Sequence, residues 1–344
     1  MRHIRSGLAA PLRISLALLL AASGTIASSQ ALACAACGCT LSKDWQTQGI
    51  NTTPGFSVDL SYDYLNQDRQ RYGSGSASGA LINSQLAAGQ EVEAYTKTQT
   101  VTAALNYTAD VWGVSAQVPY VSRTHGTYGT TAPLGSSYST SSASSIGDVR
   151  LIGRYLGFSA ERTAGLIFGV KLPTGDIGSN FSAGTSAGQP LDAGLQIGTG
   201  STDVILGGYT SGNIGSYGWF AQGTLQHAIA TRQALGSTTY RPGDTYALNT
   251  GLRYAAFGTK FSPMLQLNVV KRDADTGTGV PTDPVTGVAV SGGTLAYLAP
   301  GALWRVGSGL SLYGFVQLPV YQNVNSLQIV PQYTLTLGMR QSFE

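Results

Sequence analysis

Charged side chains are scarce in this chain of 344 residues, because Asp, Glu, Lys and Arg together make up only 11% of it. Basic residues form no patch that would suggest nucleic-acid binding, and no acidic block indicates a disordered tail. No apolar run approaches the roughly 20 residues that a transmembrane helix needs. Glycine is abundant instead, with 45 residues, where an average protein has ~7%. This composition favours a large all-β structure that forms a single domain.

The N-terminus has the features of an export signal. Arg2, Arg5 and Arg13 form a basic region, residues 14–23 form a short apolar core, and Ala31-Leu32-Ala33 places small residues where signal peptidase cleaves. The alternative, a retained N-terminal anchor, is disfavoured because the apolar stretch is too short to span a bilayer. We therefore expect residues 1–33 to be a cleaved signal peptide. The mature chain is then nearly neutral: 20 basic residues less the three arginines leave 17, against 17 acidic residues.

Histidine is also rare, with three residues in the chain and two in its mature part, His125 and His227. Nucleophilic catalysis needs a nucleophile with a base in reach, and neither histidine lies in the His-x-Ser-Asn-Gly setting of outer-membrane phospholipases. We interpret both as exposed loop residues. Two carboxylate pairs lie in or beside polar loops, where solvated surface is the expected role: Glu91 with Glu93, and Asp273 with Asp275. The glycine-rich stretches lack the lysine of a phosphate-binding loop, so we predict no enzyme activity.

All three cysteines, Cys34, Cys37 and Cys39, lie within six residues at the expected mature N-terminus. In an oxidising periplasm a Cys34–Cys37 disulfide is one interpretation. A second is a soft-metal site for Cu(I) or Zn, completed by a ligand from elsewhere or docked to a redox partner. A third is lipidation of Cys34, against which Ala31 is a poor fit to a lipobox. Gly38 excludes the haem-attachment pattern, and no resident cofactor is otherwise expected.

Strands alternate between an apolar and a polar face along most of the chain. The final segment, residues 331–344, shows Tyr333, Leu335, Leu337 and Met339 on one face and Thr334, Thr336 and Arg340 on the other. A period of two with two different faces is the pattern of a strand between two environments. In a soluble sandwich the apolar face would meet a core, whereas in a membrane barrel it would meet lipid.

Twelve such strands can be assigned, connected alternately by short turns and by long polar loops. The expected strands are 55–65, 94–107, 111–121, 147–156, 164–174, 202–209, 219–227, 243–254, 261–271, 293–306, 310–321 and a final strand from about 331 that ends at Phe343. Long loops on one side only and an even strand count are typical of outer-membrane barrels. We predict an antiparallel, up-and-down transmembrane β-barrel over residues 55–344, with short periplasmic turns and long extracellular loops. Residues 34–54 are expected to be a periplasmic segment that contains the cysteines.

Five blocks of sequence resemble a known family. They are Gly147-Asp-Val-Arg-Leu-Ile-Gly-Arg-Tyr155, Lys171-Leu-Pro-Thr-Gly175, Leu195-Gln-Ile-Gly-Thr-Gly-Ser-Thr-Asp203, Tyr240-Arg-Pro-Gly-Asp244 and the pair Ser291-Gly-Gly-Thr with Ala299-Pro-Gly301. In this order they are similar to the outer-membrane barrels grouped as phenol meta-pathway transporters. The resemblance covers residues 55–343 and implies a passive channel in the outer membrane of a Gram-negative bacterium for small, organic or aromatic solutes. The cysteine-rich start does not match the family's pattern.

Seven charged residues lie opposite apolar neighbours in their strands and are therefore expected in the lumen. They are Asp59, Asp63, Arg150, Arg154, Lys171, Arg253 and Arg340. An Arg or Lys on the lipid face would cost about 2–4 kcal/mol at mid-bilayer. These charges either line a selective pore or form a salt-bridge network that fills the barrel. Two functions follow: a diffusion channel for small solutes, or a structural barrel whose Cys34–Cys39 segment docks a metal or a periplasmic partner. The terminal Phe343 suggests recognition by the barrel assembly machinery.

Overall fold

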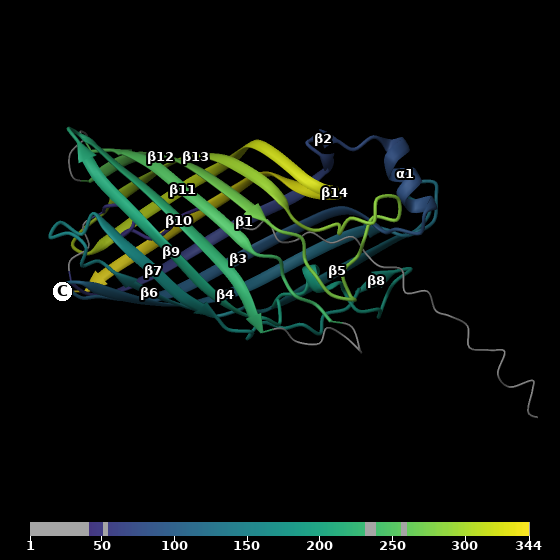
Figure 1. The fold of residues 1–344 in the computed structure, drawn as a ribbon, viewed down its shortest axis with the longest axis horizontal. Helices are drawn as coiled ribbons and strands as arrows, with labels where there is room; N and C mark the ends of the chain where they lie inside the picture. The colour runs from purple at the N-terminus through teal and green to yellow at the C-terminus, as the bar shows by residue number, and fades with distance from the viewer. Residues whose placement is uncertain (1–40, 51–53, 231–238, 256–259, 344) are drawn as a thin grey trace, which may run out of the picture.

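The chain forms a closed antiparallel β-barrel, which surrounds a long axis that lies horizontally in Figure 1. The computed structural model describes residues 41–50, 54–230, 239–255 and 260–343. Strand β1 (Gly55–Gly73) pairs on one side with β3 (Val92–Thr108) and on the other with β14 (Leu310–Phe343), which closes the ring. Among the described helices, none is both long and apolar enough to span a membrane.

The wall continues from β3 through eight further strands back to β14, in sequence order. These are β4 (Trp112–Tyr128), β6 (Arg150–Tyr155), β7 (Ala164–Lys171), β9 (Thr202–Ile214), β10 (Tyr217–Ala230), β11 (Thr245–Tyr254), β12 (Phe261–Arg272) and β13 (Gly293–Arg305). The elements outside the ring are β2 (Gly75–Ser76), α1 (Gly79–Ala87), β5 (Tyr138–Ile146), β8 (Ala183–Gly184) and a short 3-10 turn, η1 (Ala193–Leu195).

Strand β14 folds back on itself and supplies two segments of the wall. Its first part pairs with β13 and its second part pairs with β1. Between the two parts, Ser326 has a positive φ of 56°, and near the far end the Ser342 amide donates to the Gly309 carbonyl at 2.9 Å. Eleven strand elements therefore make twelve wall segments, which confirms the predicted fold class. The predicted return of the last strand onto Gly55–Leu65 is also confirmed.

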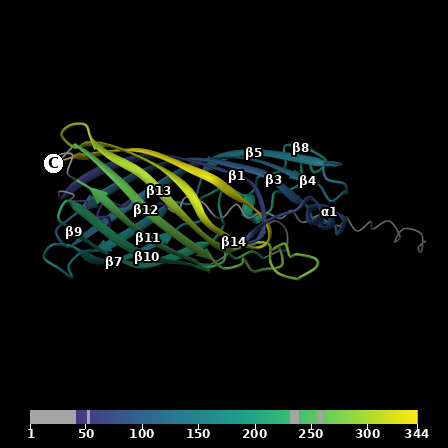
Figure 2. The same ribbon diagram turned by 90° about the horizontal axis from the view of Figure 1, so that it is seen from above.

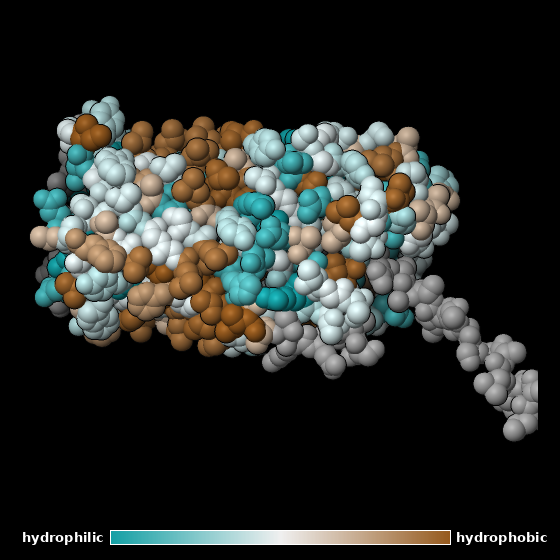
Figure 3. All heavy atoms as spheres, in the orientation of Figure 1, coloured by the Kyte–Doolittle hydropathy of each residue, from teal (hydrophilic) through white to brown (hydrophobic). Residues whose placement is uncertain are grey.

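Apolar side chains gather on the outer face of the barrel wall, as the side shown in Figure 3 illustrates, and we call them the apolar belt. Every wall strand carries at least one large exposed apolar side chain: Val58, Leu105, Val114, Leu151, Phe168, Leu206, Tyr217, Leu248, Leu265, Leu298, Val316 and Leu337. Many of their inward neighbours along the strands are polar or small, such as Asp59, Ser115 and Gln266, whereas Met264 and Phe315 are apolar and buried inside the barrel. A protein with so much exposed apolar surface is stable only when lipid covers that surface. Closure of the ring also leaves no unpaired strand edge in the bilayer.

The two ends of the barrel differ (Figures 1 and 2). The C-terminus lies at the end where short connections such as Gly215-Ser216 join the strands, and we call this the short-turn end. Helix α1, β5 and β8 lie at the opposite, long-loop end. There β1 and β4 continue as strands well beyond the predicted boundaries at residues 65 and 121, and β5 pairs with the β4 extension. The predicted loops 66–93 and 122–146 are therefore wrong in part. The strand extensions are rich in Ser and Thr because both of their faces lie outside the lipid, so they lack an apolar face.

Candidate functional site

Residues 41–50 lie inside the barrel and form a segment that we call the plug. Lys43 pairs with Asp63 on β1, Asp44 pairs with Arg154 on β6, and Thr47 donates to Gln222 on β10. Because these three strands belong to different sides of a closed ring, the segment that contacts them all must occupy the lumen. A periplasmic location was predicted for this segment, and that prediction is wrong for residues 41–50. The polar side chains of the plug pair instead with lumen groups that are distant in the sequence.

One side of the plug is polar and forms hydrogen bonds with the wall. Lys43 Nζ lies 2.6 Å from Asp63 Oδ2 and 3.0 Å from Ser61 Oγ. Gln46 Nε2 donates to Thr108 Oγ1 at 2.8 Å, and Thr47 Oγ1 donates to Gln222 Oε1 at 2.7 Å. A buried charge is tolerated when it is paired and hydrogen-bonded, so these contacts satisfy lumen groups of β1, β3 and β10.

The other side of the plug is apolar and packs against β12, β13 and β14. Its residues Leu41, Trp45 and Ile50 are buried in one cluster with Met264, Ala299, Leu303, Tyr313 and Phe315. The Arg340 guanidinium lies 4.3 Å from the centroid of the Trp45 ring, and Tyr313 meets that ring edge-on at 6.1 Å. A cation over an indole face is attracted by the ring quadrupole. The plug is therefore anchored to one half of the lumen.

Five of the seven charged residues predicted to line the pore are held in ion pairs. Arg340 Nε donates to Asp59 Oδ2 at 3.1 Å, and Tyr313 donates to the other oxygen of this carboxylate at 2.8 Å. Lys171 Nζ lies 2.9 Å from Asp203 and 3.4 Å from Asp148. Asp63 and Arg154 pair with the plug, as described above. The remaining two, Arg150 and Arg253, are in no ion pair within the described part of the chain.

Arg150 faces the lumen and is nevertheless exposed. Along β6 it shares a face with Arg154, which contacts the plug, whereas Leu151 between them is on the lipid side. The Arg150 side chain is exposed although the barrel wall surrounds it, and its neighbour in register on β4, Gln117, is partly exposed. Solvent therefore reaches the lumen side of β4 and β6, opposite the half of the wall on which the apolar side of the plug packs.

The loop of residues 176–201, which we call the covering loop, folds against the wall at the long-loop end. Arg123 of the β4 extension donates from Nη1 to the carbonyl oxygens of Leu195 and Gln196, each at 2.9 Å. Within the loop, Phe181, Leu191 and Leu195 form a small buried cluster. Burial, and secondarily the charge of Glu91, raises the pKa of the Asp192 carboxyl well above its usual range. The covering loop is thus fixed to the barrel wall at the long-loop end.

The histidines and carboxylate pairs differ from the sequence-based expectation. His125 is fully buried on the β4 extension, where Nδ1 lies 2.9 Å from Thr96 Oγ1, so its assignment to an exposed loop is wrong. Glu91, Glu93 and Asp275 are also buried, because loops and strand extensions enclose them. His227 is partly exposed, with Nδ1 2.8 Å from Asp244 and Nε2 2.9 Å from Arg241 Nη2. Both of its ring nitrogens are engaged, which leaves neither available as a base in this arrangement.

The predicted metal site lies outside the described residues, as do Cys34, Cys37, Cys39 and the expected signal peptide, so these remain predictions. Within the described ranges, no group of three or more His, Cys, Asp or Glu residues could hold a metal ion. The plug, the role of Arg123, and the pairing of Lys171 with Asp148 and Asp203 were not predicted from the sequence. A signal was present for the last of these, since Asp148, Lys171 and Asp203 each belong to one of the blocks that carry the family resemblance.

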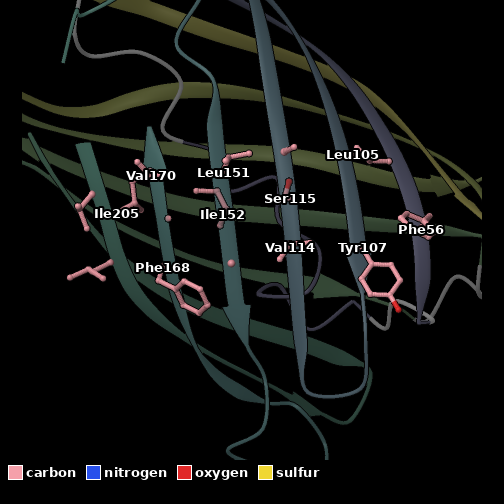
Figure 4. A pocket seen from close by; sticks show the side chains of 15 residues that line it. Phe56, Leu105, Tyr107, Val114, Ser115, Leu151, Ile152, Phe168, Val170 and Ile205 are labelled. Atoms are coloured by element: carbon pink, nitrogen blue, oxygen red, sulfur yellow. The ribbon is translucent and has the colours of Figure 1, made fainter. Parts of the chain in front are cut away.

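A hollow of about 620 Å³ lies on the outer face of the wall (Figure 4). Its rims are formed by Phe56 and Tyr107 on one side and by Phe168 and Leu206 on the other, and Gly153 lies between them. The rim side chains Phe56, Phe168 and Leu206 are each about half exposed and belong to the apolar belt. Because these rim side chains are exposed on the outer face, the hollow opens toward the bilayer.

Comparison with known proteins supports the barrel. No family model matches the chain, and no curated protein sequence matches it. Among solved structures, the COG4313 outer membrane channel from Pseudomonas putida F1 is similar with a TM-score of 0.60 and 12% identity, covering 85% of this chain and 97% of that one. The β domain of the Bordetella autotransporter BrkA has a TM-score of 0.45 and 12% identity, covering 83% of this chain and 99% of that one. At 12% identity, the similarity to the first structure establishes only the fold. The TM-score of the second structure is too low to support a conclusion. The chain has the fold of a bacterial outer-membrane β-barrel.

Proposed function

We propose that this protein is an outer-membrane channel through which small solutes diffuse past the plug. The main support for this proposal is the exposure of Arg150, whose side chain faces inward in a closed barrel and is nevertheless accessible to solvent. A lumen filled by ion pairs alone would leave such a side chain buried. Twelve wall segments enclose more space than a side-chain-filled barrel of eight strands and less than an open porin of sixteen, which suits small solutes.

The solutes that fit this path best are small organic molecules. The accessible side of the lumen presents apolar as well as polar groups, since Ile152 and Ala104 are inward-facing and partly exposed near Gln117 and Arg150. The plug narrows the path, which excludes large hydrophilic solutes. The similarity of five sequence blocks to the phenol meta-pathway transporters, and the fold shared with a protein described as an outer membrane channel, support the same assignment.

The proposal is tested with purified, refolded protein in planar bilayers and in liposomes. We expect discrete conductance steps and permeability of the liposomes to small organic solutes. Arg150→Trp should reduce the conductance by filling the path, whereas Leu151→Trp, one residue away on the lipid face, should leave it unchanged. Absence of steps together with impermeable liposomes would overturn the proposal in favour of a structural or partner-docking barrel.

A further inference from the structure

The hollow in the outer wall exists because small side chains form its floor. This floor is lined by Val114 and Ala116 of β4 and by Gly153 of β6. Gly153 lies in register between Val114 and Phe168, and an added Cβ at Gly153 would collide with the Phe168 ring. Figure 4 shows Phe168 and Tyr107 on either side of Val114. The hollow of about 620 Å³ is therefore an apolar strip of wall between two aromatic rims, with room for a chain-like apolar group.

The hollow lies in the half of the wall next to the short-turn end. Val114 follows Asp110 of the β3–β4 turn by four residues, so at most about 14 Å of strand separates them at ~3.4 Å per residue. Half of a hydrocarbon core of ~30 Å is about 15 Å, so the distance from turn to hollow matches the depth of one leaflet. Tyr107 and Trp112 lie between the two, with ring centroids 5.3 Å apart, and such rings prefer the headgroup level. Short turns of outer-membrane barrels face the periplasm, and the periplasmic leaflet of that membrane consists of phospholipids.

Charged side chains of both signs lie in the turns beyond the hollow. Arg162 in the β6–β7 turn pairs with Asp110, with Nη2 3.3 Å from Oδ1, and the adjacent Glu161 is exposed. The two turns are neighbours, because the Leu156 amide donates to the Val111 carbonyl at 2.8 Å. The side chains of Asp110 and Arg162 are 85% and 36% exposed. Exposed ion pairs contribute little to stability, so either group can take a new partner of opposite charge.

From this arrangement we infer that the outer wall binds one phospholipid whose headgroup carries a phosphate and a primary ammonium group. One acyl chain lies in the hollow, the phosphate binds Arg162, and the ammonium binds Asp110 and Glu161. A guanidinium donates two parallel hydrogen bonds to a phosphate, and charge-assisted hydrogen bonds are the stronger kind. The two turns carry two carboxylates and one guanidinium, which favours this zwitterionic headgroup over an anionic one. The inference is independent of whether solutes cross the lumen.

Two separate contributions hold this lipid. Acyl chains surround the whole barrel, so the hollow gains no hydrophobic transfer energy and instead offers more van der Waals contact than a convex part of the wall. The turns add charge-assisted hydrogen bonds, which select the headgroup. Removal of either contribution should therefore weaken the site, and the two losses can be measured separately.

The test is native mass spectrometry of the purified, refolded protein after incubation in detergent with two lipids. Phosphatidylethanolamine and phosphatidylglycerol with the same acyl chains are added in equal amounts. We expect one retained lipid per barrel, with phosphatidylethanolamine in several-fold excess. Ala116→Phe fills the hollow and should abolish this retention. Ala103→Phe is the matched control, because Ala103 is exposed on the outer face of β3 and does not line the hollow.

The charges of the two turns are tested in the same way. Asp110→Asn combined with Glu161→Gln should remove the preference for phosphatidylethanolamine, and Arg162→Gln should reduce the retention of both lipids. Lys260→Gln is the control, because Lys260 is exposed at the short-turn end immediately before β12, several strands away from β4 and β6. Gel migration of the folded form verifies that each variant is folded.

Three results would overturn the inference. Equal retention of lipid by Ala116→Phe and Ala103→Phe would show that lipid covers the wall without a site at the hollow. Equal retention of the two lipids by the wild type would show that the turns do not select a headgroup. A dimer of the wild type that Ala116→Phe disrupts would assign the hollow to a second copy of this chain instead of a lipid.

Discussion

Replacement of Trp45 by alanine should release the plug from the wall. Trp45 is 7% exposed and lies at the centre of the apolar contact between the plug and strands β12 to β14. Its ring also carries the cation–π contact with Arg340 and the edge contact with Tyr313. No other large aromatic side chain of residues 41–50 could take over these contacts.

The expected loss follows from burial. Truncation of a buried Phe or Trp to Ala costs about 3–5 kcal/mol, and each 1.4 kcal/mol is a factor of ten in an equilibrium. The ratio of docked to undocked plug should therefore fall by about two to three and a half orders of magnitude. Because the undocked plug no longer obstructs the lumen, we expect single-channel traces with a larger conductance level that is rare in the wild type.

The assay is single-channel recording, with Trp304→Ala as control. Trp304 is half exposed on the outer face of β13, so its loss removes an indole without touching the plug. Hydrogen exchange of the amides of residues 41–50 provides an independent measure, since docked amides are protected. Unchanged conductance and unchanged protection in Trp45→Ala would refute the conclusion that the apolar contact holds the plug in the lumen.

Three further outcomes are expected. Acid should strengthen docking of the covering loop. Because the pKa of Asp192 is raised in the docked state, this state binds a proton more tightly than the free loop does, so the stability of the docked loop is greatest at low pH and is lost as the pH rises through that pKa. Asp192→Asn should remove this pH dependence of hydrogen exchange. Leu206→Arg places a charge on the apolar belt and should cost about 2–4 kcal/mol in the free energy of folding into vesicles, whereas Val285→Arg on an exposed loop should be neutral. Asp44→Asn leaves Arg154 buried without its partner and should destabilise plug docking by about 3–5 kcal/mol, and a double-mutant cycle with Arg154→Gln checks whether most of this loss is specific to the pair.

The wall could be predicted from the sequence because its pattern is local. Alternation of apolar and polar residues locates each strand, and the lipid requirement for a continuous apolar face fixes which side points outward. The pairing of the last strand with the first also follows, because a barrel in lipid must close. The inward direction of Arg150 and Arg253 was predicted on the same basis.

The contents of the lumen could not be predicted, because they depend on partners far apart in the sequence. Asp44 meets Arg154 across 110 residues, and no periodicity marks the plug as anything but an irregular segment. His125 and Glu91 were predicted to be exposed to solvent, because polar residues in Ser- and Thr-rich stretches are normally exposed. Only the packing of strand extensions and the covering loop buries them. The same ion pairs decide which predicted lumen charges are neutralised and which remain free.

A water-filled path past the plug would make a side chain at position 150 accessible to reagents in the lumen, and this accessibility can be measured directly. Cysteine is introduced at Arg150 or, as a control, at Leu151, in a chain whose native cysteines are replaced by serine. A charged, water-soluble methanethiosulfonate reagent is then added during single-channel recording. We expect Arg150→Cys to react and its current to change stepwise, while Leu151→Cys, on the lipid face, does not react. An unreactive cysteine at position 150 in a folded barrel would show that no water-filled path passes the plug.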